Sequence, residues 1–207
     1  MEKGCATVKV FGVGLNKTGT TTLGQCGQIL GFRCRTYSRA LLVDFKKSNY
    51  QALFNAIEDA DLFEDWPWPL AFREIDKAYP EAKFILTTRI SPEKWYESLC
   101  AHSLRTDPFN HARRLAYGYS YPQARKSYFI QFYEDHNASV RSHFSGRPGK
   151  LLEVCWERGD GWREILNFLG CSEKTTAAFP HANKGASQEA ARFWWRGVNQ
   201  VLSVLRF

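Results

Sequence analysis

The sequence predicts an α/β protein: a three-layer α/β/α arrangement around a central parallel sheet of about five strands. Two observations predict this fold. Apolar segments alternate with amphipathic segments of helical period along the chain, as strands and crossover helices do in a parallel sheet. The strand-like segments are also continuously apolar, which is typical of strands covered on both faces. The 207 residues contain no repeat and no low-complexity segment, so we expect a single domain over residues 1–207.

Five short apolar segments are predicted to be strands. The first, "TVKVFGVGL", is rich in valine, and the fourth, "KFILTTR", is the clearest of the five. The third, "LFEDW", ends before Pro67, because proline cannot donate to a neighbouring strand. The predicted strands span residues 7–15, 32–38, 62–66, 83–89 and 149–156.

The segments between the strands have helical period. Ser91 is suited to an N-cap and Pro92 to the first turn of the helix that follows it. Residues 106–121 have no clean period and predict a loop or lid. The predicted helices span residues 21–31, two helices within 39–60 that divide near Ser48, then 70–79, 93–105, 124–144, 161–170 and a terminal helix over 187–207.

Composition narrows the partners. The formal net charge is +7, but the basic residues are scattered and form no run typical of a nucleic-acid-binding tail, so they indicate a solvated surface; a small anionic ligand would also account for the excess. The six cysteines form no CxxC pair and no cluster with histidine, so we expect reduced thiols and no metal site. No apolar stretch approaches the roughly 20 residues of a membrane span. We expect a cytoplasmic protein without membrane insertion.

The turn after the first strand, "GLNKTGTTTL", has the composition of an anion-binding loop. Gly19 allows close backbone approach, Lys17 supplies a cation, and backbone N–H groups at the start of the next helix point at a bound phosphate. This predicts a P-loop-like nucleotide-binding architecture. The usual ATPase loop needs glycines six and one positions before its lysine, where this chain has Phe11 and Asn16.

The core K-[ST]-G-T-T behind a strand instead resembles the 5′-phosphosulfate loop of the PAPS-dependent sulfotransferases, in their small P-loop-like branch (PAPS is 3′-phosphoadenosine 5′-phosphosulfate). The resemblance implies that Lys17 stabilises charge during transfer. It also implies that the loop residues bind the 5′ end of the nucleotide: Lys17, Thr18, Gly19, Thr20, Thr21 and Thr22.

The same family binds the 3′-phosphate with an arginine that ends a strand and a serine on the next helix. In "FILTTRISPEKWYESL" these are Arg89 and Ser98. The serine lies nine positions after the arginine, where the family usually has eight, so Ser91 is kept as an alternative. Two further matches are Trp156, where relatives carry an aromatic side chain near adenine, and Lys184-Gly185, which resembles a late loop over the 3′-phosphate.

The catalytic base of the family ends the strand before the arginine strand. In "LFEDWPWP" the matching residue is Asp65, with Glu64 beside it; alternation along a strand directs the two side chains to opposite sides, and we choose Asp65. His102 is the second choice. The resemblance implies sulfuryl transfer from PAPS, without a metal, to a hydroxyl, less readily an amine, of a small-molecule, glycan or lipid acceptor bound near residues 106–121. The alternatives are an ATP–Mg²⁺ kinase or NTPase, and a nucleotide-binding protein without turnover.

Overall fold

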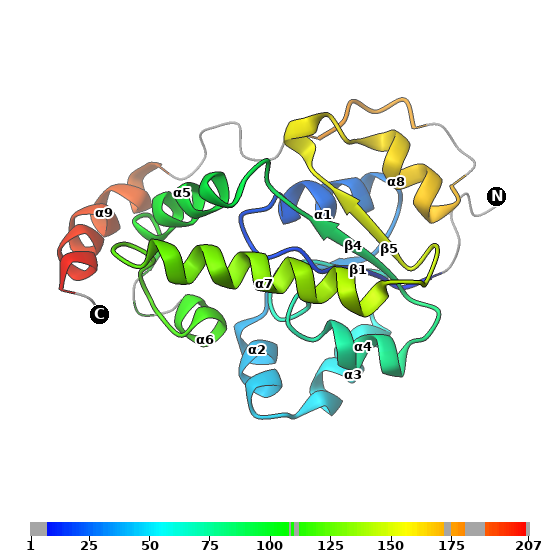
Figure 1. Ribbon diagram of the computed structural model, residues 1–207, viewed down its shortest axis with the longest axis horizontal. Coiled ribbons are helices and arrows are strands. Elements are labelled where there is room, and N and C mark those ends of the chain that lie inside the picture. The colour runs from blue at the N-terminus through cyan, green and yellow to red at the C-terminus, as the bar shows by residue number, and fades with distance from the viewer. Residues whose placement is uncertain (1–7, 108, 110–111, 172–174, 181–188, 206–207) are drawn as a thin grey trace.

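The fold is described from a computed structural model that covers residues 8–107, 109, 112–171, 175–180 and 189–205. Five parallel strands form one sheet in the order β2-β3-β1-β4-β5 (Figure 1). The central strand β1 pairs with β3 on one side and β4 on the other, so Val10 lies opposite both Leu62 and Lys83. The strands are β1 (Val10–Gly12), β2 (Cys34–Arg35), β3 (Leu62–Phe63), β4 (Lys83–Thr87) and β5 (Leu151–Val154). The predicted α/β/α fold with a parallel sheet of about five strands is confirmed.

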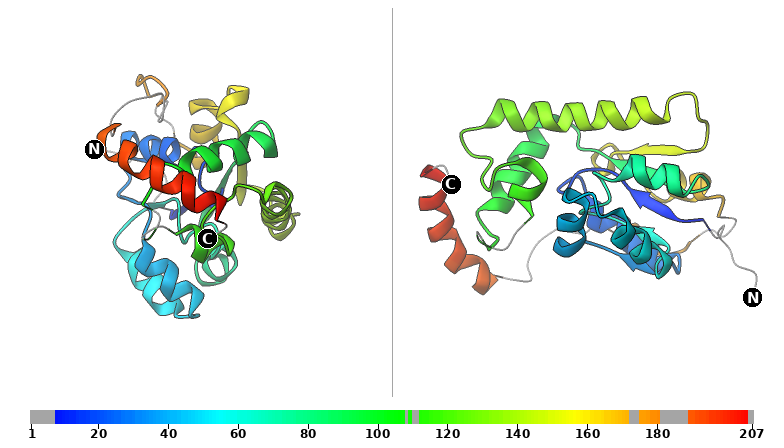
Figure 2. Two further views of the ribbon diagram at one scale, coloured as in Figure 1. Left: turned by 90° about the vertical axis from the view of Figure 1, so that its left-hand side faces the viewer. Right: turned by 90° about the horizontal axis from the view of Figure 1, so that it is seen from below.

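Helices connect these strands and cover the sheet on both faces (Figures 1 and 2). The predicted third strand is wrong at its end: β3 stops at Phe63 because Asp65 takes a left-handed backbone conformation, with φ of 64°. The predicted loop 106–121 contains a short helix, α6. The helices are α1 (Thr20–Ile29), α2 (Arg39–Lys46), α3 (Tyr50–Glu58), α4 (Phe72–Ala78), α5 (Pro92–Ser103), α6 (Arg113–Tyr117), α7 (Lys126–Phe144), α8 (Trp162–Leu169), α9 (Glu189–Val204) and the 3₁₀ turn η1 (Trp156–Arg158).

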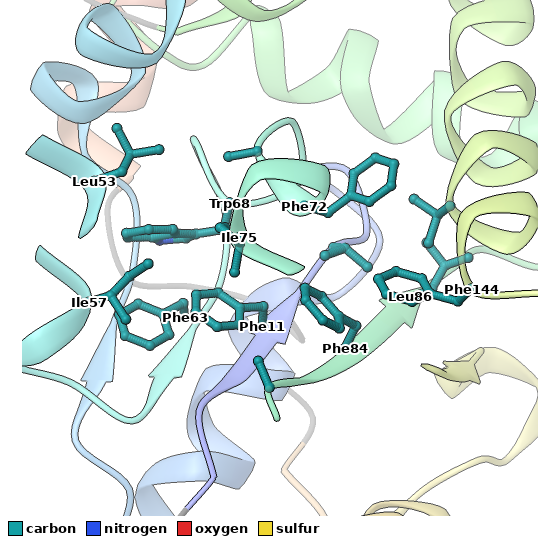
Figure 3. Close-up of a cluster of buried hydrophobic side chains, with 14 of the residues drawn as sticks. Phe11, Leu53, Ile57, Phe63, Trp68, Phe72, Ile75, Phe84, Leu86 and Phe144 are labelled. Atoms are coloured by element: carbon teal, nitrogen blue, oxygen red, sulfur yellow. The ribbon is translucent and has the colours of Figure 1, made fainter. Parts of the chain in front are cut away.

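An aromatic core lies between one face of the sheet and helices α3, α4 and α7 (Figure 3). Phe11 of β1 stacks on Phe63 of β3 with ring centroids 4.6 Å apart, and Trp68 packs edge-on against Phe63. The opposite face is covered by α1 and α8, through Leu23 and Ile165. Burial on both faces explains why the strand segments are continuously apolar.

A third cluster of buried side chains lies beyond the carboxyl ends of the strands. Trp66, Trp95 and Tyr117 meet there, with residues from α2, α5, α6 and α7. In an open parallel sheet, ligands bind at this edge. The cluster therefore supports the loops in which the predicted site residues lie.

The cysteines differ from the expectation of reduced thiols. Cys26, Cys34, Cys100 and Cys155 are free, but Cys171 is disulfide-bonded, so the expectation is wrong at that position. Among the helices that the structure describes, none combines the length and the apolar character needed to cross a membrane.

Candidate active site

The glycine of the anion-binding loop could not be replaced by a residue with a side chain. The loop joins β1 to α1, and Gly19 at its end has φ of 97°, in the left-handed region that favours glycine. A Cβ atom at Gly19 would lie 2.4 Å from Cδ1 of Trp156. Both the conformation and the close packing of the Trp156 ring require glycine here.

Side-chain donors bind the carbonyl groups of this loop. Four of these oxygens accept a hydrogen bond from a side-chain donor, and each donor comes from the loop itself or from a different element. The bonds are Thr18 Oγ1 to Leu15 O (2.6 Å), Trp95 Nε1 to Asn16 O (2.9 Å), Arg89 Nη1 to Lys17 O (3.1 Å) and Trp156 Nε1 to Gly19 O (3.1 Å). A loop whose carbonyl oxygens are held away from the ligand presents less negative charge to an anion.

The N–H groups at the start of α1 are the donors that this arrangement leaves for a ligand. The helix begins at Thr20, and its first backbone bond runs from Leu23 N to Gly19 O. The first N–H groups of a helix have no acceptor within the helix and carry a partial positive charge. The loop therefore has the backbone chemistry of a phosphate- or sulfate-binding site.

The threonines of the loop divide between support and exposure. Thr18 is 1% exposed, and its hydroxyl forms a 2.6 Å hydrogen bond with the hydroxyl of Thr87 on β4. Thr20 and Thr22 are buried, whereas Thr21 is exposed. The Thr18 side chain is therefore directed into the protein. Thr21 is the threonine of the loop that is exposed to a ligand.

Both residues predicted to be catalytic have strained backbones. Lys17 has φ of 70° and Asp65 has φ of 64°. A non-glycine residue in this conformation costs on the order of 1 kcal/mol and persists only where its surroundings enforce it. The two residues also interact electrostatically, since the positive charge of Lys17 acts to lower the pKa of Asp65. Strain and electrostatic coupling at the same pair are typical of a functional site.

The Asp65 carboxyl has the properties of a base that works near neutral pH. Burial raises the pKa of Asp65 to about 7, the negative charge of Glu64 adds to the rise, and a hydrogen bond from the Trp66 amide and the charge of Lys17 oppose it. The Trp66 N–H donates to Oδ1 over 2.8 Å, which fixes the carboxyl group while Oδ2 is not used by that bond. A general base is most effective when its pKa is close to the working pH.

Glu64 faces different surroundings from Asp65. It is 5% exposed and lies against α1, where its Oε1 would be 3.3 Å from a Cβ atom at Gly24. Burial raises the pKa of Glu64, and hydrogen bonds with Thr36 and Thr20 oppose the rise. The side chains of Glu64 and Asp65 therefore point to different surroundings, as expected. The cause is the turn after Phe63 and not the alternation of side chains along a strand.

Two tyrosines lie within electrostatic reach of Asp65. Burial raises the pKa values of Tyr37 and Tyr117, and the Asp65 carboxylate adds to both rises. Tyr117 is fully buried and donates its hydroxyl to Oδ1 of Asn16 in the loop, whereas Tyr37 is 41% exposed. Tyr37 is therefore an exposed aromatic side chain within electrostatic reach of Asp65.

Arg89 lies directly against the anion-binding loop. Its Nη1 donates to the Lys17 carbonyl, and its Nε and Nη2 bind the two carboxylate oxygens of Glu157 over 2.9 and 2.6 Å. The residues predicted to bind opposite ends of one nucleotide are thus brought together at the carboxyl edge of β1 and β4.

The remaining predicted residues have varied placements. Ser91 is the N-cap of α5 and accepts a hydrogen bond from Lys94 N, so its hydroxyl supports the helix. Ser98 is half-buried two turns into α5, one turn after Lys94. A hydrogen bond and ion pair with Glu97 raise the pKa of Lys94, and the charges of Glu157 and Arg89 also act on that pKa, so this face of α5 is close to the Arg89–Glu157 pair. His102 lies one turn further, in the last turn of α5. Lys184-Gly185 lies outside the described residues.

Sequence reasoning missed the residues that support the loop. Trp95 of α5 and Tyr117 of α6 hold the loop at Asn16, through its backbone carbonyl and its side-chain amide oxygen, and Glu157 holds Arg89. The only available signal was chemical: a buried indole N–H or phenol O–H needs an acceptor. That signal identifies a residue in need of a partner but not which partner it meets. Within the part of the chain that the structure describes, no group of three or more His, Cys, Asp or Glu side chains is placed to hold a metal ion.

A parallel sheet, a loop of anion-binding character after its central strand, and a lysine coupled to a carboxylate beside that loop are the features of an α/β protein with a candidate anion-binding site. The chain belongs to the sulfotransferase domain family, whose model matches residues 9–188. It is also similar to "Ava biosynthesis cluster protein M" of Aspergillus versicolor, at 26% identity over 93% of this chain and 89% of that protein. The chain is therefore a member of a family of transferases that act on sulfuryl groups.

Proposed function

We propose that the protein transfers a sulfuryl group from PAPS to a hydroxyl acceptor, less readily to an amine. The observation that supports the proposal is the loop in which side-chain donors bind four carbonyl oxygens, next to the first N–H groups of α1 and to Lys17, whose charge acts on Asp65. PAPS would supply the activated sulfuryl group. The residues fit its phosphosulfate end through Lys17, Gly19, Thr20, Thr21 and Thr22, and its 3′-phosphate through Arg89 and Ser98.

Each residue has a role that follows from its chemistry. Lys17 stabilises negative charge on the oxygens around the transferred group, as positioned cations do in phosphoryl transfer. Asp65 accepts the acceptor's hydroxyl proton as the new O–S bond forms, and the adenosine bisphosphate leaves with the bridging oxygen. Since the pKa of Asp65 is about 7, we expect kcat/KM to rise as pH increases through 7, where the carboxyl loses its proton.

Thermal unfolding with two nucleotides tests the donor. Adenosine 3′,5′-bisphosphate with EDTA, at about 100 times its Kd, should stabilise the protein by about 2.7 kcal/mol and raise Tm by roughly 5–10 °C. Lys17→Ala should reduce this shift. Stabilisation by ATP with Mg²⁺ and not by the bisphosphate would instead support a kinase or NTPase.

Transfer itself is measured with radiolabelled PAPS and separate panels of phenols, sugars and lipid alcohols. We expect Lys17→Ala to lower the rate on any accepted substrate by about 10²–10³-fold, the effect of removing one preorganised charge-stabilising group. Stabilisation by the bisphosphate without transfer to any panel would support a nucleotide-binding protein without turnover.

A further inference from the structure

The Arg89–Glu157 pair lies at the proposed 3′-phosphate site, and its geometry assigns a role to Glu157. The carboxylate of Glu157 accepts three hydrogen bonds: two from Arg89 and one from the Ile90 backbone N–H over 2.8 Å. The side chains of Arg89 and Glu157 are 23% and 35% exposed. The two bonds to Arg89 and the third bond to the Ile90 N–H hold the Glu157 carboxylate and the guanidinium group in one relative orientation. An isolated ion pair on the surface is not fixed in this way.

The turn that carries Glu157 is itself attached to the anion-binding loop. Glu157 lies in η1, directly after Trp156, whose Nε1 donates to Gly19 O. The start of η1 is fixed by a 2.7 Å bond from Cys155 N to the Asp160 carboxylate. One turn therefore reaches the loop twice: through Trp156 at Gly19, and through Glu157 and Arg89 at Lys17.

The hydrogen bonds that Arg89 already makes determine which of its N–H groups are available to a phosphate. A guanidinium group has five N–H donors in a rigid plane. Glu157 uses the Nε donor and one on Nη2, and the Lys17 carbonyl uses one on Nη1. Within the described part of the chain, one N–H on each of Nη1 and Nη2 has no hydrogen-bond acceptor, and the plane held by Glu157 sets the direction of these two donors.

We propose that Glu157 is a positioning residue that holds the Arg89 guanidinium in the orientation that binds the 3′-phosphate of the donor nucleotide. This inference rests on the proposed function. It goes further by assigning selectivity for a 3′-phosphate over a 3′-hydroxyl to a residue outside the expected nucleotide-binding set. Glu157 acts through Arg89 and does not touch the reacting atoms.

The test compares two nucleotides by calorimetry: adenosine 3′,5′-bisphosphate and adenosine 5′-monophosphate, which lacks the 3′-phosphate. The Kd of the monophosphate divided by the Kd of the bisphosphate is the preference for the bisphosphate, and it measures the contribution of the 3′-phosphate alone. We expect Glu157→Gln to lower the preference for the bisphosphate about tenfold, as loss of a supporting partner commonly does, and to leave the affinity for the monophosphate unchanged. A general loss of structure would weaken both nucleotides equally.

Glu153→Gln is the matched control. Glu153 lies on β5 and forms the same two-bond pair with Arg141, over 2.7 and 2.6 Å, but Arg141 belongs to α7 and not to the loop. We expect its Kd ratio to equal that of the wild-type protein. In an Arg89→Gln background, Glu157→Gln should have no further effect, because residues that act as a unit are not additive.

Other results would overturn the inference. An unchanged ratio in Glu157→Gln shows that Arg89 does not need Glu157, and a higher ratio shows that the carboxylate competes with the phosphate. If Glu157→Gln does not fold, Glu157→Asp replaces it: the carboxylate is withdrawn by one methylene, the same loss of preference is expected, and a wild-type ratio overturns the inference. Binding of neither nucleotide to the wild-type protein would contradict the proposed function as well, which separates the two failures.

Discussion

At the scale of single residues, the site depends on conformations that the chain adopts at a cost. Lys17 and Asp65 both have positive φ, and the Asp65 carboxyl is held where burial and Glu64 oppose its ionisation. Each feature lowers the free energy of unfolding. A substitution of Asp65 that keeps the shape of the side chain but removes its charge should therefore stabilise the fold and abolish sulfuryl transfer.

Asp65→Asn tests this trade-off. In the folded protein the pKa of Asp65 is about 7, against a reference value of 3.8, so the folded chain binds more protons than the unfolded chain between these values. The wild-type free energy of unfolding therefore falls as pH rises from about 4 to 7. We expect Asp65→Asn to be more stable by about 1–3 kcal/mol at pH 8, because the amide carries no charge to bury.

The measurement is urea unfolding of both proteins between pH 4 and 8. The stability gain of Asp65→Asn should grow with pH up to about 7 and stay constant above it, while sulfuryl transfer is lost and bisphosphate affinity is retained. Full activity of Asp65→Asn would remove Asp65 as the base and direct attention to Glu64 or His102. A stability gain that does not depend on pH would contradict the raised pKa.

At the scale of the elements, helix α5 separates a structural serine from a candidate ligand-binding serine. Ser91 caps the helix, Pro92 occupies its first turn, and Trp95, Leu99 and Ser103 form its buried side. Ser98 lies beside that buried side, one turn beyond Lys94. We expect the extra residue between Arg89 and Ser98 to be accommodated before α5 begins at Pro92.

The two serines give a matched pair of substitutions. Ser91→Ala should lower the free energy of unfolding by about 1 kcal/mol through loss of the cap and leave the bisphosphate Kd within about twofold of the wild-type value. Ser98→Ala should have the reverse effect: little change in stability and a bisphosphate affinity weaker by about 10- to 100-fold, the effect of one hydrogen bond to a charged group. Calorimetry and chemical denaturation measure both. If Ser91→Ala weakens nucleotide binding more than Ser98→Ala does, the alternative assignment is correct.

At the scale of the whole molecule, the C-terminal helix α9 is attached to the segment expected on the acceptor side. Asn199 of α9 is fully buried; its Nδ2 donates to the carbonyls of Leu104 and Thr106, and its Oδ1 accepts from the Tyr121 hydroxyl over 2.5 Å. Residues more than ninety positions apart in sequence are thus joined, and α9 lies at the end of the molecule beyond the sheet (Figure 2). Helix α9 therefore braces both ends of the 106–121 segment.

Asn199→Ala should lower the free energy of unfolding by about 2–3 kcal/mol, because it leaves two carbonyl groups and a hydroxyl without their partner. Since the bracing concerns the acceptor side, we expect a higher acceptor KM and an unchanged bisphosphate Kd. The control is Asn167→Ala on the exposed side of α8, which should change stability by less than about 0.5 kcal/mol. Equal weakening of nucleotide and acceptor binding would show that α9 supports the whole edge of the sheet.

Local patterns in the chain were sufficient for the fold class and for the anion-binding loop. Strand, turn and helix follow one another within residues 10–29, and the glycine, lysine and threonines are consecutive, so their relation does not depend on distant contacts. The same holds for the cap of α5. These features follow from backbone geometry and hydrogen bonding between near neighbours in sequence.

Only the tertiary structure decided what each side chain of the site does. The pairing of Arg89 with Glu157, 68 positions later, the burial of Thr18 against Thr87, and the raised pKa of Asp65 all arise from contacts between segments far apart in the chain. The same is true of the disulfide at Cys171, which no spacing predicted. Sequence periodicity indicates whether a side chain is buried but not which residue it contacts. The contacting residue determines the hydrogen bonds, the pKa and the orientation of that side chain.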